Sequence, residues 1–176
     1  MRASSRPPRR ATGCSSADVA GIRIHETPIR PEWIDYNGHL RDAHYTLIAS
    51  YAADALMDHV GLDADYRRQT RCTLYSLEMH VHYRREVMQS DALSVATSVL
   101  DFDGKRIHVG CQFSVPRLTE HAATIEMLLL HVHQADAPKS RPFPAAILQK
   151  LAPLKLSAEA LHQFAPKSRA IELQRR

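Results

Sequence analysis

Residues 35–61 read DYNGHLRDAHYTLIASYAADALMDHVG, and this stretch decides the fold class. From Arg41 to Val60 the apolar side chains recur every three or four residues, which predicts one long helix with a single buried face. That face carries Tyr45, Ile48, Ala49, Ala52, Leu56 and Val60. Gly61 follows at the position where glycine ends many helices in the left-handed conformation. Small residues are frequent on this helix, as expected where a sheet packs closely against it.

Most segments on either side of this helix alternate between apolar and polar residues, which predicts strands, and residues 122–132 form a long apolar run that fits a strand buried on both faces. We expect these strands at residues 20–30, 74–83, 93–99, 107–115 and 122–132. Within 74–83 the alternation places on one face Tyr75, Leu77, Met79, Val81 and Tyr83, and on the other Ser76, Glu78, His80 and His82. A turn is expected at residues 101–104 and a charged link at residues 63–71. One long helix among antiparallel strands makes an α+β domain.

The chain has 176 residues, enough for one domain with a substantial core, which we place at residues 19–134. Residues 1–18 form a basic tail that we expect to be disordered. Residues 135–176 form an extension broken by prolines, with room for short helices at 145–151 and 158–164. One helix cannot cover both faces of a sheet, so we expect self-association as a homodimer or homotetramer.

Composition narrows the classes of function. The net charge of +4 equals the four arginines of the tail, and the rest of the chain carries no basic stripe interleaved with aromatic residues, so we expect no nucleic-acid partner. No stretch approaches the about 20 apolar residues of a membrane helix. Three cysteines without CxxC spacing favour a reducing compartment, the cytoplasm. The pairs His80/His82 and His131/His133 lack further ligands in a suitable pattern, so we expect no metal.

The segment before the long helix carries the chemistry. Asp35 and His39 flank Gly38 in a loop that leads into the helix, where unpaired backbone amides can polarise a carbonyl and stabilise an oxyanion. A carboxylate at that point can activate water or attack the carbonyl itself. The pKa of an ordinary aspartate is about 3.9, so we expect burial to raise the pKa of Asp35. The alternative is that Asp35 or Asp42 only caps the helix.

This run resembles the Asp-x-x-Gly-His-x-x-x-x-x-Tyr pattern of the 4-hydroxybenzoyl-CoA-type acyl-CoA thioesterases, and the resemblance covers residues 20–134. Its matching positions are Asp35, Gly38, His39 and Tyr45. The resemblance implies a hot-dog fold, in which an antiparallel sheet wraps around one long helix, with the site at a dimer interface. It also implies that Asp35 is the general base or nucleophile and that Gly38 and His39 belong to the turn that binds the carbonyl. Arg41-Asp42 replaces the Asn-Asn of many members.

The longer run at residues 33–45, with residues 54–61 and 77–86, looks more narrowly like the betainyl-CoA thioesterases of carnitine breakdown. A trimethylammonium acyl group would suit aromatic faces, for which the candidates are Trp33, Tyr36, Tyr45 and Tyr51. The substrate-binding residues that we expect are Trp33, Tyr36, Asn37, Gly38, His39, Arg41 and Tyr45. Glu78 is a candidate second catalytic acid or counter-charge, whose presence beside Asp35 would raise one of the two pKa values. Its alternative is a carboxylate that faces solvent or an interface.

Two other functions stay open on the sequence. A hot-dog enoyl-CoA hydratase would carry Asp-x-Asn-Pro-x-His; Asp35-Tyr36-Asn37 begins this motif, but Gly38 replaces the proline and His39 comes one residue early. A non-catalytic hot-dog module that binds acyl-CoA is the second alternative. The presence of Asp35 in the loop before the helix argues against it, and inactivity toward every CoA ester with CoA still bound would favour it.

Overall fold

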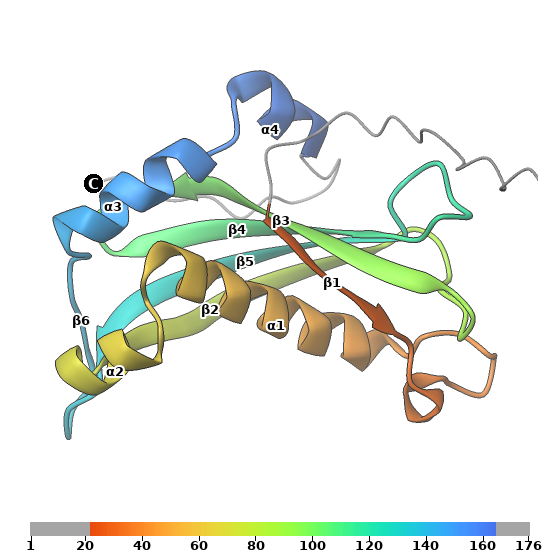
Figure 1. Cartoon of the computed structure of the whole chain (residues 1–176), viewed down its shortest axis with the longest axis horizontal. Coiled ribbons are helices and arrows are strands. Elements are labelled where there is room, and N and C mark those ends of the chain that lie inside the picture. Colours follow the sequence, from red (N-terminus) through yellow and green to blue (C-terminus); the bar gives the residue numbers. More distant parts are fainter. Residues whose placement is uncertain (1–21, 165–176) are drawn as a thin grey trace, which may run out of the picture.

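The computed structural model describes residues 22–164, so the predicted tail at residues 1–18 lies outside the described residues. The elements in chain order are β1 (Ile22–Pro28), η1 (Pro31–Trp33), α1 (Asp42–Val60), α2 (Ala64–Thr70), β2 (Cys72–Tyr83), β3 (Ala92–Phe102), β4 (Arg106–Ser114), β5 (Ala123–His133), β6 (Lys139–Ser140), α3 (Ala145–Leu151), η2 (Ala152–Leu154) and α4 (Ala158–Phe164). The main strands pair antiparallel in the order β1-β3-β4-β5-β2. Figure 1 shows this sheet curving past α1, the one long helix of the described chain, which confirms the predicted α+β hot-dog fold.

The helix α1 lies against the sheet with the face that its sequence predicts. The apolar residues of that face are buried: Tyr45, Ile48, Ala49, Ala52, Leu56 and Val60. The helix ends at Gly61, whose φ is 90° and whose N–H donates to the carbonyl of Asp58 at 3.2 Å. On the sheet, α1 meets the fully buried side chains of β4, namely Ile107, Val109, Cys111 and Phe113. Periodicity alone therefore places both halves of the core correctly.

The face pattern predicted for β2 holds from Glu78 to Tyr83 but is wrong before Glu78, because the strand contains a β-bulge. Ser76 lies opposite Leu129 and Glu78 lies opposite Leu128, so Leu77 is the extra residue. The bulge reverses the alternation: Ser76 shares the face of Met79, which packs against the core around α1. Glu78 lies opposite Leu128, on the predicted polar face, which points away from α1.

The segment predicted as a charged link is a helix in the structure, whereas the two short helices predicted after residue 134 are present. The predicted link at residues 63–71 is the helix α2, which begins where the Asp63 carboxylate accepts a hydrogen bond from the N–H of Tyr66 at 2.8 Å. This helix has no buried residue, so it shows no apolar period in the sequence. By contrast, α3 and α4 occupy the predicted ranges 145–151 and 158–164. Ile147 and Leu151 of α3 belong to the same core as α1, so the segment after residue 134 contributes to that core.

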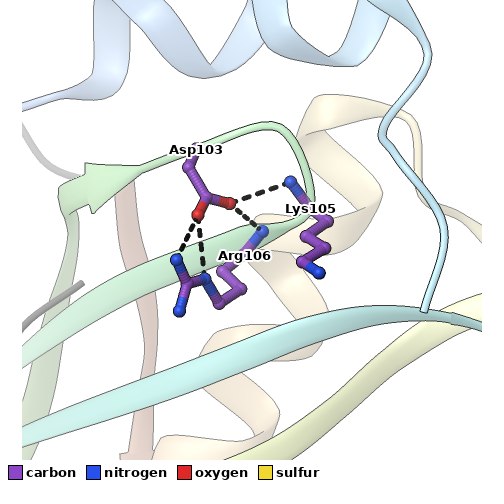
Figure 2. Close-up of polar contacts among 3 residues, drawn as sticks. All are labelled: Asp103, Lys105 and Arg106. Carbon is purple, nitrogen blue, oxygen red and sulfur yellow. Dashed lines mark hydrogen bonds and ion pairs between the residues drawn. The ribbon is translucent and has the colours of Figure 1, made fainter. Parts of the chain in front are cut away.

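The turn between β3 and β4 is built around the carboxylate of Asp103. One oxygen accepts hydrogen bonds from the backbone N–H groups of Lys105 (2.9 Å) and Arg106 (2.7 Å), and the other accepts two from the guanidinium of Arg106 (Figure 2). Partial burial raises the pKa of Asp103, but the hydrogen bonds from Arg106 and from the two amides outweigh burial and leave the pKa below its ordinary value. This turn closes the hairpin at residues 103–105 and so overlaps the predicted range 101–104 only in part, because β3 continues to Phe102.

Candidate active site

The loop before α1 is closed at its base by backbone hydrogen bonds. Ile34 bridges Leu40, and the N–H of Arg41 donates to the carbonyl of Trp33 at 2.9 Å. At the tip, Gly38 has a φ of 81°, in the left-handed region that favours glycine. An added Cβ would meet nothing within 4 Å there, so the backbone angle is the only local reason for glycine. The closed loop presents its tip at the start of α1.

The carboxylate of Asp35 is held by its own loop. One oxygen accepts hydrogen bonds from the N–H of Asn37 (2.8 Å) and the N–H of His39 (3.1 Å), and the Asp35 N–H donates to the carbonyl of His39 at 2.8 Å. Among the described residues, the second oxygen meets only the side-chain amide of Asn37, at 3.5 Å. Asp35 therefore carries one oxygen fixed by the loop and a second that is open for chemistry.

These hydrogen bonds set the pKa of Asp35. The N–H of His39 lowers the pKa below its ordinary value, and although desolvation opposes this, the contacts with Asn37 add to the lowering. The expectation that burial raises this pKa is therefore wrong, because backbone donors solvate the charge in place of water. Asp35 is an anion at neutral pH.

Neither Asp35 nor Asp42 caps the start of α1, which was the alternative explanation for an aspartate in this segment. The N-cap residue is Arg41, without a side-chain hydrogen bond, and Asp42 lies inside the helix, where its carboxylate accepts from the N–H of Ala43 at 2.8 Å. The carboxylate of Asp35 is committed to the loop amides instead. The structural role of Asp35 is thus to shape the loop, and its open oxygen is not explained by capping.

Glu78 does not join Asp35 within the chain. It points away from α1, and His80 lies within 3.0 Å of its carboxylate. The start of α1 lies at the other end of β2, where the Tyr83 hydroxyl donates to the carbonyl of Asp42 at 3.2 Å. Five residues of strand separate Glu78 from Tyr83, about 16 Å at 3.3 Å per residue.

A family model described as the thioesterase-like superfamily matches residues 29–151, more than half of the chain. The chain belongs to this superfamily. The membership confirms the predicted thioesterase resemblance and the predicted enzyme class, a thioester hydrolase. The matched range includes the loop of Asp35, α1 and α3.

Relatives agree with this membership. The betainyl-CoA thioesterase of Pseudomonas aeruginosa is 42% identical over 140 residues, which cover 80% of this chain and 87% of that protein. An L-carnitine dehydrogenase/betainyl-CoA thioesterase of Agrobacterium fabrum is 35% identical over 138 residues, which cover 78% of this chain but 28% of that protein. A Staphylococcus aureus protein solved in complex with CoA is 27% identical, with a TM-score of 0.68 over 84% of this chain and 88% of that chain.

The predicted substrate-binding residues of this thioesterase fall into two groups. Beside Asp35, the loop surface carries the exposed residues Tyr36, Asn37, Gly38 and Arg41 and the half-buried His39. Trp33 and Tyr45 are buried instead. The Trp33 ring stacks on His44 at 5.2 Å between centroids and has the Arg30 guanidinium over it at 5.1 Å. An aromatic face for a substrate must therefore come from another ring.

Sequence reasoning missed two contacts at this site. Tyr83 is half exposed, and its ring meets that of Tyr45 edge-on at 5.2 Å between centroids. The carbonyl of the buried Val87 accepts from the N–H of Leu40 at 2.7 Å, which docks the 84–91 loop against the loop of Asp35. Both contacts join segments about forty residues apart, so no local pattern reveals them.

Two other features, a metal site and a membrane-spanning helix, are absent from the described residues. Within residues 22–164, no group of three or more His, Cys, Asp or Glu side chains is arranged to hold a metal ion. In the same part of the chain, no helix is long and apolar enough to cross a membrane.

Proposed function

We propose that this thioesterase hydrolyses betainyl-CoA, an acyl-CoA thioester, with Asp35 as the catalytic carboxylate. The observation that carries the proposal is the anionic Asp35, fixed through one oxygen by the N–H groups of Asn37 and His39 and open at the other. The 42% identity with the betainyl-CoA thioesterase of P. aeruginosa supports the choice of acyl group.

In the proposed reaction the loop supplies the carboxylate and the start of α1 stabilises the oxyanion. In the first turn of α1 the N–H of Ala43 donates to the Asp42 carboxylate and that of His44 to the Arg41 carbonyl. The helix N-terminus still carries partial positive charge, which suits the oxyanion formed on the thioester carbonyl. The low pKa of Asp35 suits a carboxylate that attacks the carbonyl carbon or orients a water toward it. The C–S bond breaks, CoA leaves as the thiolate, and water supplies the oxygen of the released acid.

Aromatic rings and acids gather near the start of α1. The exposed ring of Tyr83 lies beside Tyr45, and partial burial, together with the nearby charge of Asp42, raises the pKa of Tyr83. Burial is the main cause that raises the pKa of Tyr45 to about 12, and the charge of Glu86 adds to the rise. The carboxylate of Asp91 is already paired with Arg117, so Asp42 and Glu86 are the acids that this face offers to a substrate. An aromatic face among carboxylates suits a quaternary ammonium group, because cation–π attraction and charge attraction add.

A comparison of two esters tests the acyl group. Betainyl-CoA and 3,3-dimethylbutyryl-CoA have the same shape, but only the first carries a positive charge. We expect kcat/KM, from thiol release, to favour betainyl-CoA by about tenfold or more, as about 1–2 kcal/mol of cation–π attraction would give. Tyr83→Leu should reduce this preference, and the control Tyr83→Phe, which keeps the ring, should retain it.

Two outcomes would contradict the proposal in different ways. Equal kcat/KM values for the two esters would show that the charge of the acyl group is not recognised. Failure to release thiol from any CoA ester, with CoA still bound, would leave the non-catalytic binding module as the better reading.

We further propose that the enzyme works as a homodimer or homotetramer in the cytoplasm. Within the described residues β2 pairs with β5 alone, so its other edge is open to a second strand. This open strand also exposes the side chains of Tyr75 and Leu77. Light scattering on the intact chain measures the number of subunits.

A further inference from the structure

Arg117 ties together two loops that lie near the start of α1. It belongs to the 115–122 loop between β4 and β5, and its Nε donates to both carboxylate oxygens of Asp91, at 2.9 and 3.0 Å. Its Nη2 donates to the backbone carbonyl of Glu86. Asp91 and Glu86 both lie in the 84–91 loop between β2 and β3, and the side chain of Asp91 is only 8% exposed. A planar guanidinium can hold these two acceptors at once.

The partner of Arg117 shapes the loop on which it lies. The carboxylate of Asp91 also accepts from the N–H of Met88 at 2.8 Å, and the Asp91 N–H donates to the Met88 carbonyl at 3.0 Å. These bonds close a turn at residues 88–91. The residue before this turn, Val87, is fully buried and accepts from the N–H of Leu40 at 2.7 Å. Met88 itself bridges His39.

The same path continues to the catalytic carboxylate. His39 donates its N–H to Asp35 at 3.1 Å and accepts from the Asp35 N–H at 2.8 Å. We infer that Arg117, through its pair with Asp91, is a positioning residue that fixes the carboxylate of Asp35 by way of Met88 and His39. The inference rests on the proposed role of Asp35.

A second ion pair between the same two loops provides a matched control. Arg85 of the 84–91 loop pairs with Glu120 of the 115–122 loop at 2.5 Å, and both side chains are about half exposed. Exposed pairs of this kind contribute little to stability. Glu120→Gln therefore removes a charge pair across the two loops without touching the turn at 88–91.

The test separates kcat from KM in thiol release from the preferred CoA ester. We expect Arg117→Lys and Asp91→Asn to lower kcat by about tenfold with KM within about twofold, because misplacing a reacting group lowers the rate more than binding. Arg117→Ala should lose up to about a hundredfold. Glu120→Gln should keep the wild-type values. In an Asp35→Asn background, Arg117→Lys should cause no further loss, since the two residues act on one step.

Three results would overturn the inference. A rise in KM with kcat intact would make Arg117 a substrate-binding residue. An equal loss of kcat in the Asp35→Asn background would show that Arg117 does not act through Asp35. Wild-type kinetics in Arg117→Lys and Asp91→Asn would show that the pair positions nothing. In each case the wild type still releases thiol, whereas an inactive wild type would refute the proposed function itself.

Discussion

Two turns of this molecule are built in nearly the same way around an aspartate. In the loop before α1, Asp35 accepts from the N–H groups of Asn37 and His39; in the β3–β4 turn, Asp103 accepts from those of Lys105 and Arg106. In both turns the hydrogen bonds leave the pKa of the carboxyl below its ordinary value. The hydrogen bonds from backbone amides therefore do not distinguish the proposed catalytic aspartate from the structural one.

The difference lies in the second carboxylate oxygen. Arg106 holds that of Asp103 through two hydrogen bonds, at 2.8 and 2.6 Å (Figure 2). The corresponding oxygen of Asp35 meets only the amide of Asn37 at 3.5 Å among the described residues. A carboxylate whose charge is fully used by a guanidinium has no lone pair to offer a substrate. The free oxygen of Asp35, beside a helix N-terminus, is thus the feature on which its proposed catalytic role rests.

The largest expected effect is a difference in activity between the Asp→Asn variants of the two turns. Asp35→Asn keeps the size and part of the hydrogen bonding of the side chain but removes the charge, so we expect thiol release to fall by about a hundredfold or more. Asp103→Asn makes the same chemical change in the other turn, and we expect its kcat/KM to stay within about twofold of wild type. Steady-state assays of the two variants and wild type, side by side, measure this.

The activities of these two variants together decide whether Asp35 is the catalytic carboxylate. Full activity in Asp35→Asn would refute Asp35 as the catalytic carboxylate. An equal loss in both variants would show that the effect comes from a disturbed fold, which thermal unfolding of each variant would reveal.

A smaller effect is expected in the free energy of unfolding, where alanine variants of the two turn glycines should differ. Gly38 has a φ of 81° with no atom within 4 Å of an added Cβ, while Gly104 has equally open space without such a φ. Gly38→Ala should lower the free energy of unfolding by about 1 kcal/mol, because alanine resists the left-handed region. Gly104→Ala should stay within about 0.5 kcal/mol of wild type. Urea unfolding measures both, and equal losses would contradict the backbone argument.

Much of the fold could be predicted because its signals are local. The face of α1 and its end at Gly61 follow from periodicity and from the conformation that glycine adopts. The ranges of α3 and α4 follow from the prolines that limit the stretches between them. The bulge at Leu77 could not be predicted, since it depends on how β2 pairs with β5. The short helix α2 gave no signal because none of its side chains is buried.

The site shows the same contrast between features that a local motif predicts and features that depend on the folded structure. The motif placed Asp35, Gly38 and His39 in one loop, and the structure brings them together there. The direction of the Asp35 pKa shift was wrong because it depends on amide donors that only the folded loop arranges. Glu78 lies on the face that the alternation predicts, and that face points away from α1, so a single chain does not bring this residue to Asp35.

The smallest effect should appear in the pH dependence of stability. The folded pKa of Asp103 is lower than the about 3.9 expected when unfolded, so its charge stabilises the fold above that pH and the stabilisation is lost as the pH falls through the folded pKa. Wild type should exceed Asp103→Asn by about 1 kcal/mol in the free energy of unfolding from pH 7 to about pH 5, as expected for the loss of charge-assisted hydrogen bonds. The difference should shrink below about pH 4. Urea unfolding at a series of pH values measures it, and a difference that persists unchanged at about pH 3 would show that the charge is not its source.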